Sequence, residues 1–96
     1  MSLLKIAVHP GRILREEYLK PYELSAGRLA AHIGVPRTRI ERLVKEETAM
    51  TVDTAKRLAV AFNTTPNFWM NLQTNYELNT QDVAAAAEIE PLRLTA

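Results

Sequence analysis

Residues 25 to 44 read SAGRLAAHIGVPRTRIERLV, and the spacing of small, turn-forming and branched residues predicts two short helices joined by a tight turn. Ala30 lies where the helices would cross closely, because a side chain larger than methyl would push them apart. Gly34 lies where the chain must turn, because glycine readily takes the positive φ that ends a helix. Ile40 then places a branched side chain of the second helix on the first. This is the spacing of a helix-turn-helix, so DNA is the first partner to consider.

The second helix of this pair has a buried stripe and a basic outer face. Ile40, Leu43 and Val44 recur at i, i+3 and i+4, which predicts that they face the core. The residues left facing outward are Arg37, Thr38, Arg39, Glu41, Arg42 and Lys45. Residues 28 to 45 hold five Lys or Arg and one Glu, an excess of positive charge suited to phosphates. The alternative interpretation is an ordinary helical hairpin with a solvated basic face.

The composition fits one small domain whose two halves differ in charge. A chain of 96 residues with 47% hydrophobic content is long enough for one compact domain and too short for two. The net charge is only +1, but residues 1 to 48 hold nine basic and six acidic residues, and the remainder holds three and five. The basic half contains the predicted motif. This asymmetry is modest and supports nucleic-acid binding only together with the motif.

Several classes of function find no support in the sequence. The chain has no cysteine, which excludes disulfides, thiolate nucleophiles and cysteine-ligated zinc. His9 and His32 are 23 residues apart with no paired carboxylate nearby, and we predict no metal site and no cofactor. The few serines and the adjacent glutamate pairs do not suit an active site, so we expect neither an enzyme nor a small-molecule substrate. There is no signal peptide or long apolar run, and we expect a soluble intracellular protein without a membrane partner.

The helix signals predict an all-α fold. We expect an arm over residues 1 to 9 with an extended start at 3 to 8, five short helices over 10 to 78, and a tail over 79 to 96. Prolines mark the bounds of two predicted helices: Pro10 lies in the first turn of the first helix and Pro21 after its end, and Pro36 takes the first position of the third. Hydroxyl side chains are the predicted N-caps of the others: Ser25 for the second helix, Thr51 for the fourth, and Thr64 or Thr65, before Pro66, for the fifth. Four consecutive alanines in the tail favour helix to about Glu90 followed by a loose end, so we expect a helical or flexible tail.

The fifth predicted helix carries an apolar stripe with two interpretations. Its members are Phe68, Trp69, Leu72 and Tyr76. Ordinary packing against the fourth helix is the more common use of such a stripe. A small protein that binds a palindromic site, with half-sites about 34–36 Å apart, also needs a two-fold partner. We therefore hypothesise that part of this stripe, together with the tail, forms a homodimer contact.

Four segments in order give the chain a specific resemblance. These are HPG at 9 to 11, ILREEYL at 13 to 19, the motif at 25 to 45, and NFWMNLQTNYEL at 67 to 78. Over roughly residues 8 to 80 the chain resembles the HigA antitoxins, VapI-like members of the XRE class of Cro and phage-repressor proteins. The resemblance implies a five-helix, lambda-repressor-like domain in the bacterial cytoplasm. It also implies a homodimer that represses its own operon and neutralises a HigB-type, ribosome-associated toxin that cleaves mRNA.

The family pattern also implies which residues contact DNA. Base reading falls on Arg37, Thr38, Arg39 and Arg42, and phosphate contact on Arg28, His32 and Lys45. A guanidinium can bond bidentately to a guanine edge, and a threonine can contact a thymine methyl group or a phosphate. Phosphate contacts would add salt dependence without specificity.

Two departures from the family pattern bear on affinity. Relatives often place Gln at the second residue of the motif, where this chain has Ala26, so one phosphate contact is missing. Relatives often have an Asn-Gly-Lys-like turn after the second helix, where this chain has Glu46 and Glu47. These acids would repel phosphate or tilt the segment away from DNA. A protein-binding antitoxin with little DNA affinity and a stand-alone phage-type repressor therefore remain as alternatives.

Overall fold

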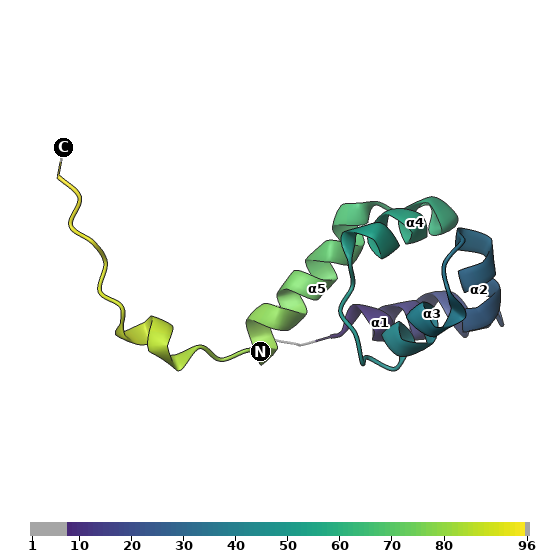
Figure 1. Ribbon diagram of the computed structural model, residues 1–96, viewed down its shortest axis with the longest axis horizontal. Helices are drawn as coiled ribbons and strands as arrows, with labels where there is room; N and C mark the ends of the chain where they lie inside the picture. The colour runs from purple at the N-terminus through teal and green to yellow at the C-terminus, as the bar shows by residue number, and fades with distance from the viewer. Residues whose placement is uncertain (1–7, 96) are drawn as a thin grey trace.

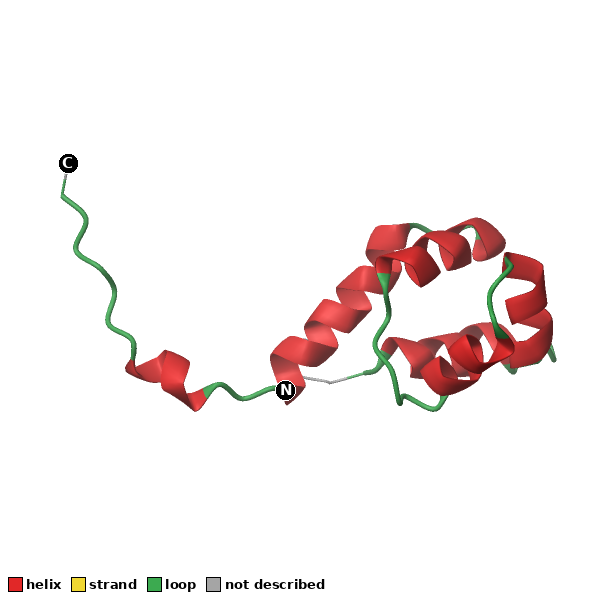
Figure 2. Ribbon diagram, in the orientation of Figure 1, coloured by secondary structure: helices red, strands yellow, loops and turns green. Residues whose placement is uncertain are grey.

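The computed structural model describes residues 8–95. Figures 1 and 2 show a body of packed helices followed by a tail that leaves it. The elements are α1 (Pro10–Ile13), which continues into the π-helical turn η2 (Leu14–Leu19), α2 (Ala26–Ile33), α3 (Arg37–Val44), α4 (Val52–Phe62), α5 (Pro66–Thr80) and the short 3-10 helix η3 (Ala84–Glu88). No strand occurs between residues 8 and 95. The all-α class is confirmed, while most of the predicted extended start at residues 3 to 8 lies outside the described residues.

The first helix widens part of the way along. His9 is its N-cap, and the imidazole Nδ1 accepts a hydrogen bond from the Gly11 N–H at 2.9 Å. Pro10 occupies the first turn, as predicted, and the helix ends before Pro21. From Leu14 to Leu19 the helix is π-helical, and both of these residues are buried although they are five positions apart. A π-helical turn brings residues five apart closer to one face than an α-helix does.

The predicted helix-turn-helix is α2 and α3. The Ser25 hydroxyl accepts a hydrogen bond from the Arg28 N–H, so the predicted N-cap is confirmed. Gly34 has φ of +74°, the left-handed conformation that the turn requires. Pro36 is one position earlier than predicted: it is the N-cap of α3, with extended ψ, and Arg37 is the first helical residue. A residue whose N–H is missing is tolerated at both positions, and the sequence pattern does not separate them.

Helices α4 and α5 close the core over the helix-turn-helix. Thr51 caps α4 as predicted, and Thr65 rather than Thr64 caps α5. The Thr64 hydroxyl instead accepts a hydrogen bond from Nε1 of the buried Trp69 at 2.9 Å. The core combines side chains of η2, α2, α3, α4 and α5, of the turn between α2 and α3, and of the loop before α4: Leu14, Leu19, Leu29, Ala30, Val35, Ile40, Leu43, Met50, Ala55, Leu58 and Trp69. Burial of this set supplies the main driving force for the fold.

Helices α2, α3 and α4 and the first helix all end in the same backbone motif. In each, one residue takes a positive φ, and the next N–H bonds to the carbonyl five residues earlier, the Schellman pattern. The four left-handed residues are Glu23, Gly34, Glu46 and Asn63. One of the four is glycine. The other three have a Cβ, which is unfavourable in this conformation, and two of those three are glutamates.

The tail differs from the prediction. Helix α5 ends at Thr80, two residues past the predicted domain end, and the α-helix does not reach Glu90. Residues 81 to 83 separate α5 from η3, where the four alanines lie, and residues 89 to 95 form neither helix nor strand. Every described residue from 77 onward is exposed. An alanine run too short to propagate an isolated helix receives no tertiary contact to stabilise it.

Candidate nucleic-acid interface

Helix α3 presents a polar outer face above two anchoring side chains. Ile40 and Leu43 are buried against the core, and Val44 is half-buried. The exposed residues of α3 and its C-cap are Arg37, Thr38, Arg39, Arg42 and Lys45, while Glu41 is half-buried. The predicted inner face is therefore confirmed at Ile40 and Leu43 and the predicted outer face at the exposed residues, whereas Val44 and Glu41 are each only half-buried. The four residues expected to read bases all belong to the outer face of one helix.

The arginines on this face are paired with carboxylates, a feature that the charge count did not predict. Arg37 Nε lies 3.5 Å from Glu41 within α3, and Arg42 Nε lies 4.0 Å from Glu47 just beyond it. Arg39 Nη1 lies 2.5 Å from Oδ2 of Asp53 on α4. Exposed pairs at the longer distances contribute little stability and are exchanged for phosphate or bases at small cost. The excess charge along residues 28 to 45 is thus partly balanced in space.

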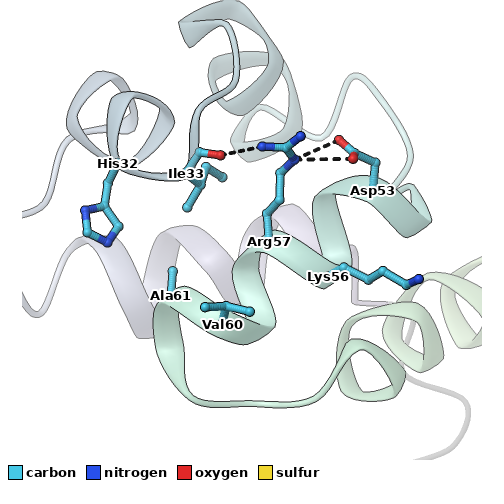
Figure 3. Close-up of a pocket in the computed structure, with 7 residues that line it drawn as sticks. All are labelled: His32, Ile33, Asp53, Lys56, Arg57, Val60 and Ala61. Atoms are coloured by element: carbon cyan, nitrogen blue, oxygen red, sulfur yellow. Dashed lines mark hydrogen bonds and ion pairs between the residues drawn. The ribbon is translucent and has the colours of Figure 1, made fainter.

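Asp53 holds two guanidinium groups at once. Arg57 Nε donates to both carboxylate oxygens, at 3.3 and 3.1 Å, and Arg57 Nη1 donates to the Ile33 carbonyl oxygen at 2.7 Å (Figure 3). Hydrogen bonds from Arg39 first and Arg57 second hold the pKa of Asp53 below its ordinary value. These contacts connect the end of α2, the start of α4 and the outer face of α3. Asp53 lies in the first turn of α4, and nothing in the local sequence indicates a partner 14 residues away.

A hollow of about 460 Å³ lies between α3 and the beginning of α4. Its wall includes Thr38, Arg39 and Arg42 from the predicted reading set, with Thr48, Thr51 and Asp53 from the other side. Thr48 and Thr51 were not predicted as site residues. What indicates a role for these two threonines is their position across the hollow from α3, and that position depends on the fold.

The residues expected to contact phosphate do not form one group. Arg28 and His32, on α2, line a different hollow of about 290 Å³ with Leu24, Ala61 and Phe62. His32 also lines a third hollow, against α4, together with Lys56 and Arg57 (Figure 3). Lys45 is exposed at the end of α3. The structure therefore brings Thr38, Arg39 and Arg42 together and places Arg28 and His32 on the side of α2 that faces α4.

The two acids after α3 are not equivalent. Glu46 has φ of +63° and its carboxylate lies 3.4 Å from Arg15 of the first helix, which also donates to the Val44 carbonyl oxygen. Glu16 first, and Glu46 after it, raise the pKa of Arg15. Glu46 is thus turned toward the body of the protein, whereas Glu47 faces Arg42. Of the two acids expected to repel phosphate, only Glu47 pairs with α3.

The apolar stripe of α5 divides between core and surface. Trp69 is 0% exposed, packed against Tyr18 and Phe68, so its assignment to a dimer contact is wrong. A side chain enclosed by its own chain has no area left for a second copy. Phe68 is 38% exposed, and Leu72 and Tyr76 are half-buried. These three keep surface for a partner.

Two buried polar residues anchor the site's framework and were not predicted as such. The Gln73 side-chain oxygen accepts a hydrogen bond from the Met50 N–H at 2.7 Å, which fastens the loop before α4 to α5. The His9 ring packs edge-on against Tyr76, with centroids 4.9 Å apart.

Among residues 8–95, no group of three or more His, Cys, Asp or Glu side chains is placed to hold a metal. In the same range no helix is long and apolar enough to span a membrane.

Comparisons with known proteins agree with this architecture. The helix-turn-helix family model matches residues 16–69. Virulence-associated protein I of Dichelobacter nodosus is 47% identical over 88 residues, which cover 90% of this chain and 82% of that protein. Antitoxin HigA-1 of Vibrio cholerae is 34% identical over 71 residues, covering 74% of this chain and 67% of that protein.

A solved structure extends the likeness to three dimensions. The Pseudomonas aeruginosa antitoxin HigA, solved with the higBA promoter, is 39% identical, with a TM-score of 0.80. The superposition covers 92% of this chain and 100% of that one. The family model spans more than half of the sequence, and the relatives match across nearly the whole fold. The chain therefore belongs to the helix-turn-helix family and, within it, to the HigA antitoxins.

Proposed function

We propose that this protein is a homodimeric autorepressor that binds its own operator through α3 and neutralises a HigB-type, mRNA-cleaving toxin. The observation that carries the DNA-binding part is the exposed row of Arg37, Thr38, Arg39 and Arg42 on a helix anchored by two buried aliphatic residues. The P. aeruginosa relative solved with its promoter supports the same role. Both activities are binding functions that need no catalytic residue.

In this proposal α3 lies in the major groove. Arg39 and Arg42 donate to guanine edges, and each bidentate contact contributes about 1–3 kcal/mol of discrimination. Thr38 contacts a thymine methyl group or a phosphate. Lys45, Arg28 and His32 contact phosphates, and these contacts set the salt dependence of affinity rather than the sequence.

In the proposed homodimer, a second copy of the chain packs against the exposed part of α5 and the tail. Phe68, Leu72 and Tyr76 retain surface on α5. The tail adds exposed apolar side chains at Val83, Ile89, Leu92 and Leu94 that no part of the body covers. An exposed apolar segment of this length is typical of an interaction surface. A two-fold partner also gives the half-site spacing of about 34–36 Å that palindromic operators require.

The deciding experiment is fluorescence anisotropy with a labelled duplex from the protein's own upstream region and a scrambled duplex, at two salt concentrations. The parent is expected to bind the upstream duplex selectively, and Arg39→Ala and Arg42→Ala are each expected to lose part of that selectivity, because the other arginine still reads its base. Arg12→Ala is the matched control, because it removes the same charge from an exposed position on α1. Equal, weak binding of the parent to both duplexes contradicts the repressor function.

A second candidate is an antitoxin that binds its toxin but has little DNA affinity. The observation favouring it is the pairing of all three outer arginines of α3 with carboxylates, which offsets their charge. Weak, non-selective DNA binding with intact toxin binding would decide for it. Co-expression with a HigB-type toxin tests that activity directly: restored growth supports neutralisation, and unrelieved toxicity with selective DNA binding points to a stand-alone repressor.

A further inference from the structure

We propose that Asp53 of α4 fixes the orientation of Arg39 and so determines how well this protein discriminates its operator from other DNA. The inference rests on the proposed DNA-binding function and assigns a role to a residue that does not belong to α3. It concerns specificity rather than affinity, because a carboxylate beside the groove repels phosphate while it orders the arginine.

The geometry of the pair leaves Arg39 able to read a base. Only Nη1 of Arg39 bonds Asp53, at 2.5 Å. Arginine has five N–H donors in a rigid fork, so Nε and Nη2 keep the two donors that a guanine O6 and N7 accept. Arg37 and Arg42 differ, because each meets its carboxylate through Nε at 3.5 Å or more. Arg39 is thus the arginine of α3 whose side chain is held most closely by a neighbouring element.

The carboxylate is itself held in place. Arg57 lies one turn further along α4 and donates through Nε to both oxygens of Asp53. Its Nη1 donates to the Ile33 carbonyl oxygen at the end of α2 (Figure 3). A chain of contacts therefore runs from α2 through Arg57 and Asp53 to Arg39. A carboxylate with the ordinary aspartate pKa is already charged at neutral pH, and the hydrogen bonds from Arg39 and Arg57, which lower the pKa of Asp53, keep these contacts intact into more acidic solution.

A fixed guanidinium loses less side-chain entropy on binding the matching base and cannot easily swing to a phosphate. Asp53 should therefore raise the ratio of operator affinity to non-specific affinity. Its negative charge lowers both affinities through repulsion of phosphate. A purely electrostatic role predicts only the second effect, so the two roles separate in the affinity ratio.

Two variants with opposite charge changes test this by anisotropy on the upstream and scrambled duplexes. Asp53→Asn removes a negative charge and is expected to raise scrambled-duplex affinity while lowering the affinity ratio by about fivefold to tenfold. Arg57→Gln removes a positive charge, lowers scrambled-duplex affinity and lowers the ratio as well, because Asp53 is no longer held. Circular dichroism checks that both variants remain folded. Ratios equal to the parent's in both variants overturn the proposal.

The same measurements in an Arg39→Ala background show whether Asp53 acts through Arg39. There Asp53→Asn is expected to leave the affinity ratio unchanged, because the side chain that it positions is missing. A further drop in the ratio overturns the proposal. If the parent itself fails to distinguish the two duplexes, the DNA-binding function fails first. If the parent binds selectively and the affinity ratios of the variants equal the parent's, the role of Asp53 is refuted and the DNA-binding function stands.

Discussion

At the scale of single residues, Gly11 is the glycine of this chain with the least room for a side chain. A Cβ built there would lie 1.8 Å from the Leu43 carbonyl oxygen, a backbone atom at the end of α3. The equivalent Cβ at Gly27 would meet only the flexible Arg37 side chain, at 3.0 Å. Gly11 therefore allows the first helix to pack directly on the helix proposed to bind DNA.

We expect Gly11→Ala to lower the free energy of unfolding by about 2–3 kcal/mol, because the first helix must move away from α3. Gly27→Ala is the matched control, and there helix propensity should leave stability equal or slightly higher. Urea unfolding followed by circular dichroism measures both. Equal effects of the two substitutions would show that the contact with Leu43 is relieved at no cost.

His9 makes stability depend on pH. Burial lowers the pKa of His9, against smaller opposing effects of Glu46 and the Thr48 backbone. Because the unfolded chain binds the proton more readily, stability is full above the ordinary histidine pKa of about 6.5. It falls as pH drops through that value and levels off below the folded pKa. Denaturant unfolding between about pH 7.5 and about pH 5.5 should show this loss.

A pair of variants assigns the pH effect to His9. His9→Asn retains a good N-cap residue but cannot titrate, so the loss of stability toward acid pH should shrink. His32→Asn changes the exposed histidine of α2 and should leave the loss in place. The opposite pattern would attribute the pH dependence to His32.

At the scale of elements, three helix ends place a residue other than glycine in the left-handed conformation. Glu23 terminates the first helix with φ of +50°, a conformation that glycine adopts without a steric penalty. The side chain of Glu23 is exposed. We expect Glu23→Gly to raise the free energy of unfolding by about 0.5–1 kcal/mol, as relief of the left-handed strain exceeds the added chain entropy.

Glu23→Ala separates the backbone effect from the charge. It removes the same carboxylate but keeps a Cβ, so it should not stabilise the protein. Thermal unfolding of the parent and the two variants measures the difference. Equal stabilisation by glycine and alanine would attribute the effect to the lost charge instead.

At the scale of the whole molecule, the proposed dimer depends on surface that a single chain leaves uncovered. We expect Phe68→Ser to give a folded monomer in sedimentation velocity, because Phe68 is the exposed aromatic of the α5 stripe. Val60→Ser is the control, since Val60 on α4 is 85% exposed and lies outside the proposed contact. A folded Phe68→Ser dimer would contradict this assignment. Leu92→Ser tests the tail in the same way.

The sequence determined the features that depend on neighbours within about one helical turn. The caps at Ser25 and Thr51, the turn at Gly34 and the inner stripe of α3 follow from residues three to five positions apart. They suffice for an all-α fold with a helix-turn-helix and for the outward position of four candidate DNA-binding residues. The resemblance to HigA antitoxins rested on longer segments and was confirmed by the comparisons.

Only the tertiary structure decided how those residues are surrounded. It enclosed Trp69 in the core, widened the first helix between Leu14 and Leu19, and left the alanine-rich tail without a packing partner. It also brought Asp53 to Arg39 across 14 residues of sequence. Contacts between distant residues depend on how whole helices cross, and side-chain periodicity within one helix carries no information about that crossing. The charge on α3 was therefore evident from the sequence, and the carboxylates that orient and offset it were not.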